Sequence, residues 1–173
     1  LRDPSAESWN PKTIRLALLR EELRAKQESL TKDLERKQED VARLEAAVAE
    51  AGADWATLTN TVWGMRIDIE TRKPVLTGTI GGYSGPPLKP IALRCVVEVH
   101  RALPELPILG CGGVRHGDDV VEYLLAGASA VGVGTAHFES PRIASRILRQ
   151  LERRMQRMGV ERIDQLVGGM ESW

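Results

Sequence analysis

Two glycine clusters in the second half of the chain have the residue types of an anion-binding site. The first is Gly110–Gly113, which follows the apolar run Pro107–Leu109, and the second is Gly134-Thr135, which follows Ala130–Val133. Glycine lets backbone N–H groups approach an anion closely, because no side chain stands between them. One such cluster alone serves a simple chain turn equally well. Two clusters at matching strand ends favour a phosphate site.

The segment from Pro107 to Thr135 predicts one strand–helix–strand unit. A short apolar run ends in glycine, an amphipathic stretch is closed by Gly127, and a second apolar run follows. In a parallel α/β barrel, the carboxyl ends of such strands meet at one rim, where phosphate sites form after the last two strands. We therefore expect both glycine clusters to lie at the same rim.

A similar order of helix, glycine and strand occurs earlier in the chain. Gly52 closes a helical stretch and precedes a predicted strand over Ala53–Thr61, as Gly127 precedes the later strand. Such an internal repeat is typical of barrel units. Asn60 and Thr61 then project from the same rim as the glycines. An Asn-Thr pair at a strand end is usually a turn, but at this rim we expect it to contact a ligand.

Length and composition limit the classes of protein that fit. The chain has 173 residues, whereas a complete eight-unit barrel takes about 250. Its 24 basic and 24 acidic residues balance, which does not favour nucleic acid or a membrane surface as partner. No run is apolar enough to span a bilayer. Cys95 and Cys111 form no Cys-x-x-Cys motif, and the histidines lack ligand spacing, so we expect no metal site and a cytoplasmic protein.

The first part of the chain predicts a long helix. From Thr13 to Glu50 there is neither glycine nor proline, and helix-forming residues dominate. Apolar residues recur at heptad spacing and predict a coiled-coil-like seam and a homo-oligomer. We expect a heptad helix over residues 1–45, followed by a barrel domain over residues 46–173. The seam consists of Leu16, Leu23, Leu30 and Leu44 at one position and Leu34, Val41 and Val48 at the other.

The remaining segments predict a mixture of loops and helices. Short strands are expected at Met65–Glu70 and Val75–Thr79, and Gly81–Pro87 appears in neither helix nor strand because it is rich in glycine and proline. A helix is expected over Leu88–Ala102, with Ile91 facing inward.

The last third ends in two predicted helices. The first begins at Ser140-Pro141 and has an apolar stripe that includes Leu148, and a short final helix covers Val160–Gly168. Six arginines lie on the outer face of the first of these helices. A solvated exterior explains them best, and contact with a polyanion is the alternative.

The segment Gly81–Arg94, Gly-Gly-Tyr-Ser-Gly-Pro-Pro-Leu-Lys-Pro-Ile-Ala-Leu-Arg, resembles a signature of the FMN-dependent dihydroorotate dehydrogenases. The resemblance is greatest to their two-subunit, NAD-linked class, and it covers about Ala46 to Gly159. It implies the last three strand–helix units of a (β/α)8 TIM barrel, FMN as cofactor, and an electron-transfer subunit as a partner. Other segments that resemble the family, in order, are Ala51–Thr61, Gly64-Met65, Asp68–Leu76, Gly110–Gly113 and Ala126–Phe138.

The resemblance implies roles for individual residues. Asn60 and Thr61 match the family's Asn-Thr pair, which contacts orotate or dihydroorotate. The family oxidises dihydroorotate to orotate in pyrimidine biosynthesis, by passing a proton to a base and a hydride to the flavin. Residues at positions of cofactor contacts are Thr59, where the family usually has isoleucine, and Gly85, Gly112, Gly113, Gly134 and Thr135, the last four at the FMN phosphate.

The chain also departs from the family pattern. It has no counterpart of the family's catalytic cysteine or of the lysine that contacts the flavin, and most of Thr13–Asp40 matches no family segment. We therefore assign no catalytic residue and expect very slow or undetectable turnover by this chain alone. Two alternatives stay open: an inactive coiled-coil interaction protein that carries a relict or engineered partial barrel, and another phosphate-binding barrel enzyme.

Overall fold

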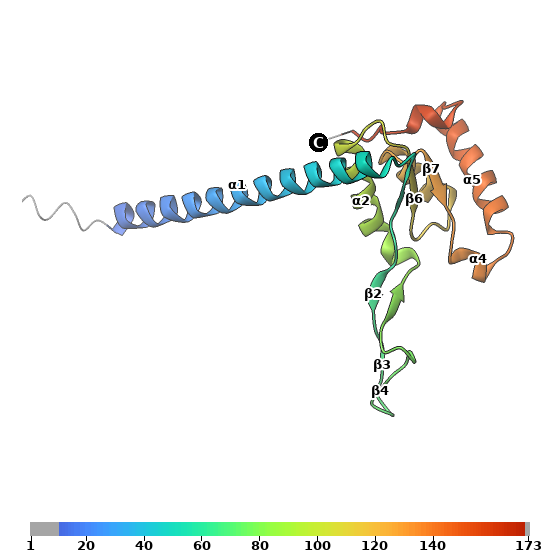
Figure 1. Cartoon of the computed structure of the whole chain (residues 1–173), viewed down its shortest axis with the longest axis horizontal. Coiled ribbons are helices and arrows are strands. Elements are labelled where there is room, and N and C mark those ends of the chain that lie inside the picture. The colour runs from blue at the N-terminus through green and yellow to red at the C-terminus, as the bar shows by residue number, and fades with distance from the viewer. Residues whose placement is uncertain (1–10, 172–173) are drawn as a thin grey trace, which may run out of the picture. The chain divides into compact units, whose positions relative to one another are not determined.

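The computed structural model describes residues 11–171, and the chain divides into two compact units, Leu1–Ala51 and Gly52–Trp173. In the first unit, helix α1 (Pro11–Ala51) is continuous over 41 residues (Figure 1). Gly52 ends it with a positive φ of 57°, a conformation that glycine adopts without strain. The predicted long helix is thus confirmed, while residues 1–10 of the predicted first domain lie outside the described residues.

The heptad seam of α1 carries exposed apolar side chains. Leu23 and Leu30 are both exposed, and the side chains of Leu16, Leu34, Val41 and Leu44 lie outside the described residues. The seam's pairing with another helix stays a prediction. No helix in the described part of the chain combines the length and the apolar character needed to cross a bilayer.

The second unit is built on a three-stranded parallel sheet with the order β1-β6-β7. Its strands are β1 (Ala56–Leu58), β6 (Ile108–Cys111) and β7 (Ala130–Gly132). In the register, Leu58 lies beside Gly110, and Gly110 lies beside Val131. The predicted α/β class with a parallel sheet is confirmed. The first strand is shorter than the predicted Ala53–Thr61, because only residues 56–58 pair with β6.

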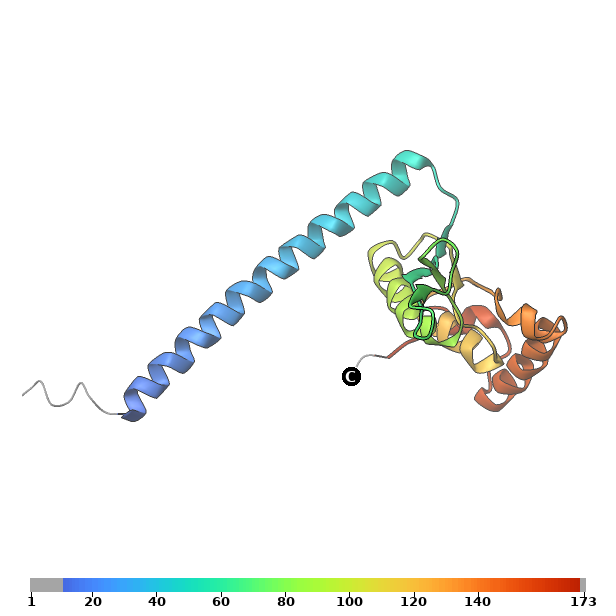
Figure 2. The same cartoon turned by 90° about the horizontal axis from the view of Figure 1, so that it is seen from below.

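Three helices supply most of the core beside this sheet: α2 (Lys89–Ala102), α3 (Gly117–Leu125) and α5 (Ile143–Met158). Figure 2 shows them around the strands. Tyr123 of α3, which is fully buried, packs against Gly110, where an added Cβ would lie 3.1 Å from the ring atom Cε1. The shorter elements are η2 (Pro86–Leu88), α4 (Ala136–Glu139) and η3 (Ile163–Leu166).

An antiparallel ribbon leaves the sheet between β1 and α2 (Figure 1). Strand β2 (Val62–Gly64) pairs with β5 (Gly81–Tyr83), and β3 (Ile67–Asp68) pairs with β4 (Lys73–Pro74). The prediction that Gly81–Pro87 holds neither helix nor strand was wrong, because Gly81–Tyr83 form β5. Gly82 lies so close to the Thr61 side chain that only glycine fits in this pairing. The predicted strand at Val75–Thr79 is also absent, since Thr79 turns the chain at a φ of 67°.

The helices differ from prediction in three details. Helix α5 begins at Ile143 rather than at Ser140-Pro141, because Ser140 ends α4 and its carbonyl accepts the Ile143 N–H at 3.0 Å. Leu148 on α5 and Ile91 on α2 are exposed, because the buried stripes run through the residues next to them in sequence, Ile147 and Ala92, which lie on another face of each helix. The predicted final helix over Val160–Gly168 is only the short 3-10 turn η3.

Candidate functional site

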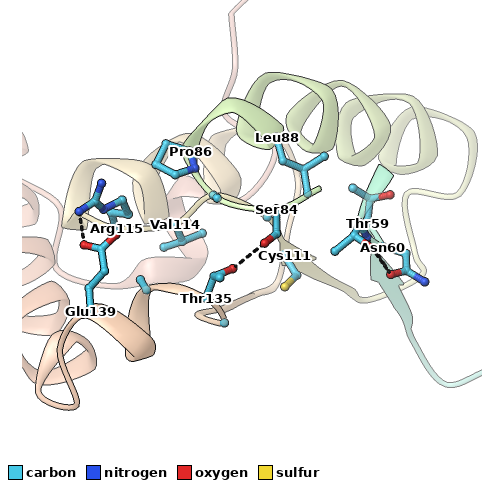
Figure 3. Close-up of a pocket in the computed structure, with 16 residues that line it drawn as sticks. Thr59, Asn60, Ser84, Pro86, Leu88, Cys111, Val114, Arg115, Thr135 and Glu139 are labelled. Atoms are coloured by element: carbon cyan, nitrogen blue, oxygen red, sulfur yellow. Dashed lines mark hydrogen bonds and ion pairs between the residues drawn. The ribbon is translucent and has the colours of Figure 1, made fainter. Parts of the chain in front are cut away.

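An open pocket of about 300 Å³ lies at the carboxyl ends of the three parallel strands (Figure 3). The segments that follow β1, β6 and β7 line it, together with the turn before η2. Every site residue predicted from the sequence borders this one pocket. These residues are Thr59, Asn60, Thr61, Gly85, Gly112, Gly113, Gly134 and Thr135.

The loop after β6 is packed so closely that two of its positions require glycine. Gly112 and Gly113 have φ values of 138° and 70°, which side chains rarely adopt. A Cβ at Gly113 would lie 2.8 Å from the Gly85 carbonyl oxygen and 2.9 Å from Cβ of Lys89. A Cβ at Gly112 would lie 3.0 Å from Cβ of Ala92. The loop therefore lies directly against the start of α2.

Side chains of α2 and α3 hold this loop in place. The Tyr123 hydroxyl donates a hydrogen bond to the Gly112 carbonyl at 2.7 Å. Oδ2 of Asp119 accepts hydrogen bonds from the backbone N–H groups of Arg115 and His116, at 2.7 and 2.8 Å. Its other oxygen accepts one from Nζ of Lys89 at 2.7 Å. Three donors thus fix one largely buried carboxylate beneath the loop.

These contacts also determine the charge states beneath the loop. Burial alone would raise the pKa of Asp119, but the hydrogen bonds from Lys89, Arg115 and His116 outweigh it and lower the pKa below its ordinary value. Burial alone would lower the pKa of Lys89, but hydrogen bonds to Asp119 and Glu122 raise it. Burial raises the pKa of Tyr123. At neutral pH, Asp119 and Lys89 are therefore charged and Tyr123 is a neutral donor.

The loop after β7 is built differently. Gly134 and Thr135 are exposed, and a Cβ at Gly134 would meet nothing within 4 Å. The Thr135 hydroxyl lies 3.2 Å from the hydroxyl of Ser84, which connects this loop to the turn before η2. No protein acceptor in residues 11–171 receives the backbone N–H of Gly113 or of Thr135.

The two loops together fit the phosphate group of FMN. They offer backbone N–H donors without protein acceptors, and their glycines leave room for an anion to approach. Phosphate sites in proteins commonly use such concave sets of backbone N–H groups. The lining residues fit a phosphate ester in this respect, and no metal is needed for the contact.

Asn60 and Thr59 lie at the other end of the pocket from Arg115 and Glu139 (Figure 3). The Thr59 N–H donates to the Cys111 carbonyl at 2.9 Å, which ties the end of β1 to the end of β6. Oδ1 of Asn60 accepts the Thr61 N–H at 2.7 Å. This bond orients the amide of Asn60 at the pocket end that is distant from the charged pair.

Sequence reasoning missed four polar lining residues: Ser84, Cys111, Arg115 and Glu139. Ser84 and Cys111 lay inside recognised motifs but were assigned no contact. Arg115 and Glu139 form an ion pair that joins the two glycine loops (Figure 3). The available signal was that each glycine cluster is followed within five residues by a charged side chain, and that the two charges are opposite.

Comparison with known proteins gives the ancestry of the chain. A family model described as "Dihydroorotate dehydrogenase" matches residues 28–155. It begins within α1, so it covers residues 28–40 and leaves residues 13–27, the larger part of Thr13–Asp40, unmatched.

Individual relatives give the same result. The chain is 46% identical over 134 residues to "Dihydroorotate dehydrogenase B (NAD(+)), catalytic subunit" of Halalkalibacterium halodurans, covering 78% of this chain and 43% of that protein. It is 48% identical over 132 residues to the protein of the same name in Pelobacter propionicus, covering 76% of this chain and 43% of the relative.

Solved structures from Eimeria tenella extend the comparison to the fold. The dihydroorotate dehydrogenase in complex with ferulenol superposes with a TM-score of 0.62 at 27% identity, covering 76% of this chain and 35% of the other. The ligand-free form gives 0.62 at 28% identity, covering 76% and 36%. The chain spans about two fifths of the length of the curated relatives named above. By the extent of these matches, the chain belongs to the dihydroorotate dehydrogenase family.

Proposed function

We propose that this chain supplies the phosphate-binding part of a dihydroorotate dehydrogenase active site, which uses FMN to oxidise dihydroorotate to orotate. One observation carries the proposal. Both glycine loops and the Asn60-Thr61 pair border one pocket at the carboxyl ends of the parallel strands. Ligands of α/β barrels bind at that end of the strands, and the family membership indicates which ligands to test.

Each predicted site residue has a proposed role in this pocket. Gly112, Gly113, Gly134 and Thr135 hold the phosphate through backbone N–H groups, while Asn60 and Thr61 orient orotate or dihydroorotate through hydrogen bonds. FMN, when bound, supplies the hydride acceptor. Thr59 and Gly85 contact the cofactor between these two ends, where Gly85 keeps a positive φ of 91°.

The chain alone is proposed to bind ligands without appreciable turnover. It contains no residue that we assign as catalytic base, and base assistance contributes about 10²–10⁴-fold in rate. Dye reduction with dihydroorotate should therefore be undetectable or very slow. Family-like rates would contradict this and would require a base among the lining residues.

The sheet suggests how the chain is completed. We interpret β1, β6 and β7 as the last three strands of a TIM barrel, with β1 and β7 at the edges of the sheet. Such edges expose unpaired backbone groups that another chain can cover. A cytoplasmic homo-oligomer, paired through the α1 seam, and an electron-transfer subunit are the proposed partners. The relatives' name, "catalytic subunit", supports the second of these.

Titration calorimetry with FMN, and with orotate in the presence and absence of FMN, tests the proposed function. We expect FMN to bind and orotate to bind more tightly when FMN is present. Absence of flavin binding would favour the coiled-coil interaction protein, and phosphate binding without orotate binding would favour another barrel enzyme.

Sedimentation of the chain beside a Leu23→Glu, Leu30→Glu variant tests the proposed oligomer, and a wild-type chain that is monomeric at high concentration would contradict it.

A further inference from the structure

Arg115 and Glu139 place opposite charges at one end of the pocket. Arg115 follows the glycine loop after β6, and Glu139 ends α4 after the loop that follows β7. Nη2 of Arg115 pairs with the Glu139 carboxylate, so the ion pair spans from one glycine loop to the other (Figure 3). Among the lining residues, these two carry the formal charges.

The pair is accessible to solvent, unlike the ion pair beneath the loop. The Arg115 and Glu139 side chains are 38% and 57% exposed, whereas those of Lys89 and Asp119 are 23% and 11% exposed. Asp119 is further held by two backbone N–H groups. In the described residues, the Arg115 guanidinium and the Glu139 carboxylate make no further hydrogen bond that would fix this ion pair. An exposed pair of this kind contributes about 0–1 kcal/mol, so a stronger partner can displace one of its members.

A phosphate ester is such a partner for the guanidinium. Arginine forms short, charge-assisted and often bidentate hydrogen bonds with phosphate. The glycine loops offer neutral N–H donors in the same pocket, so a phosphate bound by them leaves its negative charge uncompensated unless a cation approaches. Glu139 has the opposite effect, because its carboxylate pairs with the guanidinium and so competes with the phosphate for it.

We propose that Arg115 is the charged donor of the phosphate site and that Glu139 competes with the phosphate for it. The site takes a phosphate monoester, and binding transfers the guanidinium from the carboxylate to the phosphate. This inference rests on the proposed function for the identity of the ester, FMN. The competing carboxylate limits affinity and makes it depend on the charge of the phosphate group.

The proposal predicts opposite changes in FMN affinity for two substitutions that each remove one charge. Arg115→Gln removes the donor and should weaken FMN binding about tenfold, since hydrogen bonds to charged groups contribute about 1.5–3 kcal/mol and partial exposure reduces this. Glu139→Gln removes the competitor and should tighten FMN binding about threefold, in line with a screened charge interaction of about 1 kcal/mol or less. The double variant should bind like Arg115→Gln, because Glu139 acts through Arg115.

Calorimetric titrations with FMN, riboflavin and inorganic phosphate provide the test. Riboflavin lacks the phosphate, so neither substitution should change its affinity, whereas inorganic phosphate should follow FMN. Arg101→Gln is the matched control for Arg115→Gln, because it changes the net charge by the same amount. Arg101 is exposed in the last turn of α2 and does not line the pocket. Thermal unfolding of all variants should show midpoints close to wild type.

The outcomes separate this inference from the proposed function. Parallel weakening of FMN and riboflavin by both substitutions would mean that the ion pair only braces the loops, and would overturn the inference. FMN binding that responds to neither substitution would overturn it as well, while the proposed function would stand. Opposite responses with phosphate in a chain that binds no FMN would support the inference and refute the flavin assignment. A wild-type chain that binds neither phosphate nor FMN would refute both.

Discussion

The two loops of the pocket both contain glycine but have different surroundings. Gly112 and Gly113 pack against α2 and the Gly85 turn, and the buried Asp119 carboxylate and Tyr123 hydroxyl form hydrogen bonds with the loop. Gly134 is exposed, and an added Cβ there would meet no atom within 4 Å. The first loop is therefore part of the packed core, whereas the second can change without disturbing it. Glycine is needed for folding at one loop and, on the proposed function, for ligand access at the other.

Gly113→Ala should have the largest effect on stability, because it disrupts the packing of the loop after β6 against the start of α2. The alanine must adopt a φ of 70°, and its Cβ would lie 2.8 Å from the Gly85 carbonyl oxygen, which already accepts the Leu88 N–H. Left-handed backbone and overpacking together cost about 3 kcal/mol or more. Urea denaturation measures this loss. A variant as stable as wild type would show that the loop is not packed as described.

Asp119→Asn should destabilise the chain by about 2 kcal/mol at pH 7, because it leaves Lys89 and two N–H donors with a poorer acceptor. The pKa of Asp119 is lowered in the folded chain. Its stabilisation is therefore present above the unfolded value of about 3.9 and is lost as pH falls through the folded pKa. Denaturation curves at several pH values should show wild type and variant converging below about pH 4. A pH-independent difference would contradict the assigned charge.

Tyr123→Phe should cost about 1 kcal/mol, because the Gly112 carbonyl loses its donor at 2.7 Å while the ring's packing is kept. Since burial raises the pKa of Tyr123, its hydroxyl stays protonated, and the difference from wild type should not vary between pH 7 and 9. Urea denaturation across that range provides the measurement. A difference near zero would mean that water replaces the hydroxyl.

Gly134→Ala should have the smallest effect on stability, within about 0.5 kcal/mol, because the site is exposed and has no positive φ. On the proposed function, the same change should weaken FMN binding, since it places a methyl group beside the phosphate donors. This makes Gly134 a better test of binding than Gly112, where substitution strains the fold as well. Unchanged FMN affinity in the Gly134→Ala variant would remove this loop from the proposed site.

Sequence reasoning succeeded where local patterns and spatial neighbours coincide. The apolar runs around Ile108 and Val131 end in glycine, and adjacent parallel strands place those ends together. It failed for β5, because Gly81 and Gly82 lack the side chains that reveal a strand. The Arg115–Glu139 pair was missed because it joins residues 24 positions apart, and only the positions of two loops bring them together.

The start of α5 was misplaced for a related reason. Ser140-Pro141 is a typical helix start in sequence, but Ser140 is used as the end of α4, and the next helix begins at Ile143. A four-residue helix such as α4 leaves no periodic pattern to recognise.

The antiparallel ribbon determines what tryptophan fluorescence reports in this chain. Within the described residues, tryptophan occurs at Trp55, beside β1, and at Trp63, on the ribbon, and these are 62% and 80% exposed. The aromatic residue of the core is instead Tyr123. Emission from Trp55 and Trp63 should therefore already be red-shifted in the folded chain and change little when the core unfolds. A blue shift of that emission would signal that a second surface has covered the ribbon or the adjacent edge strand.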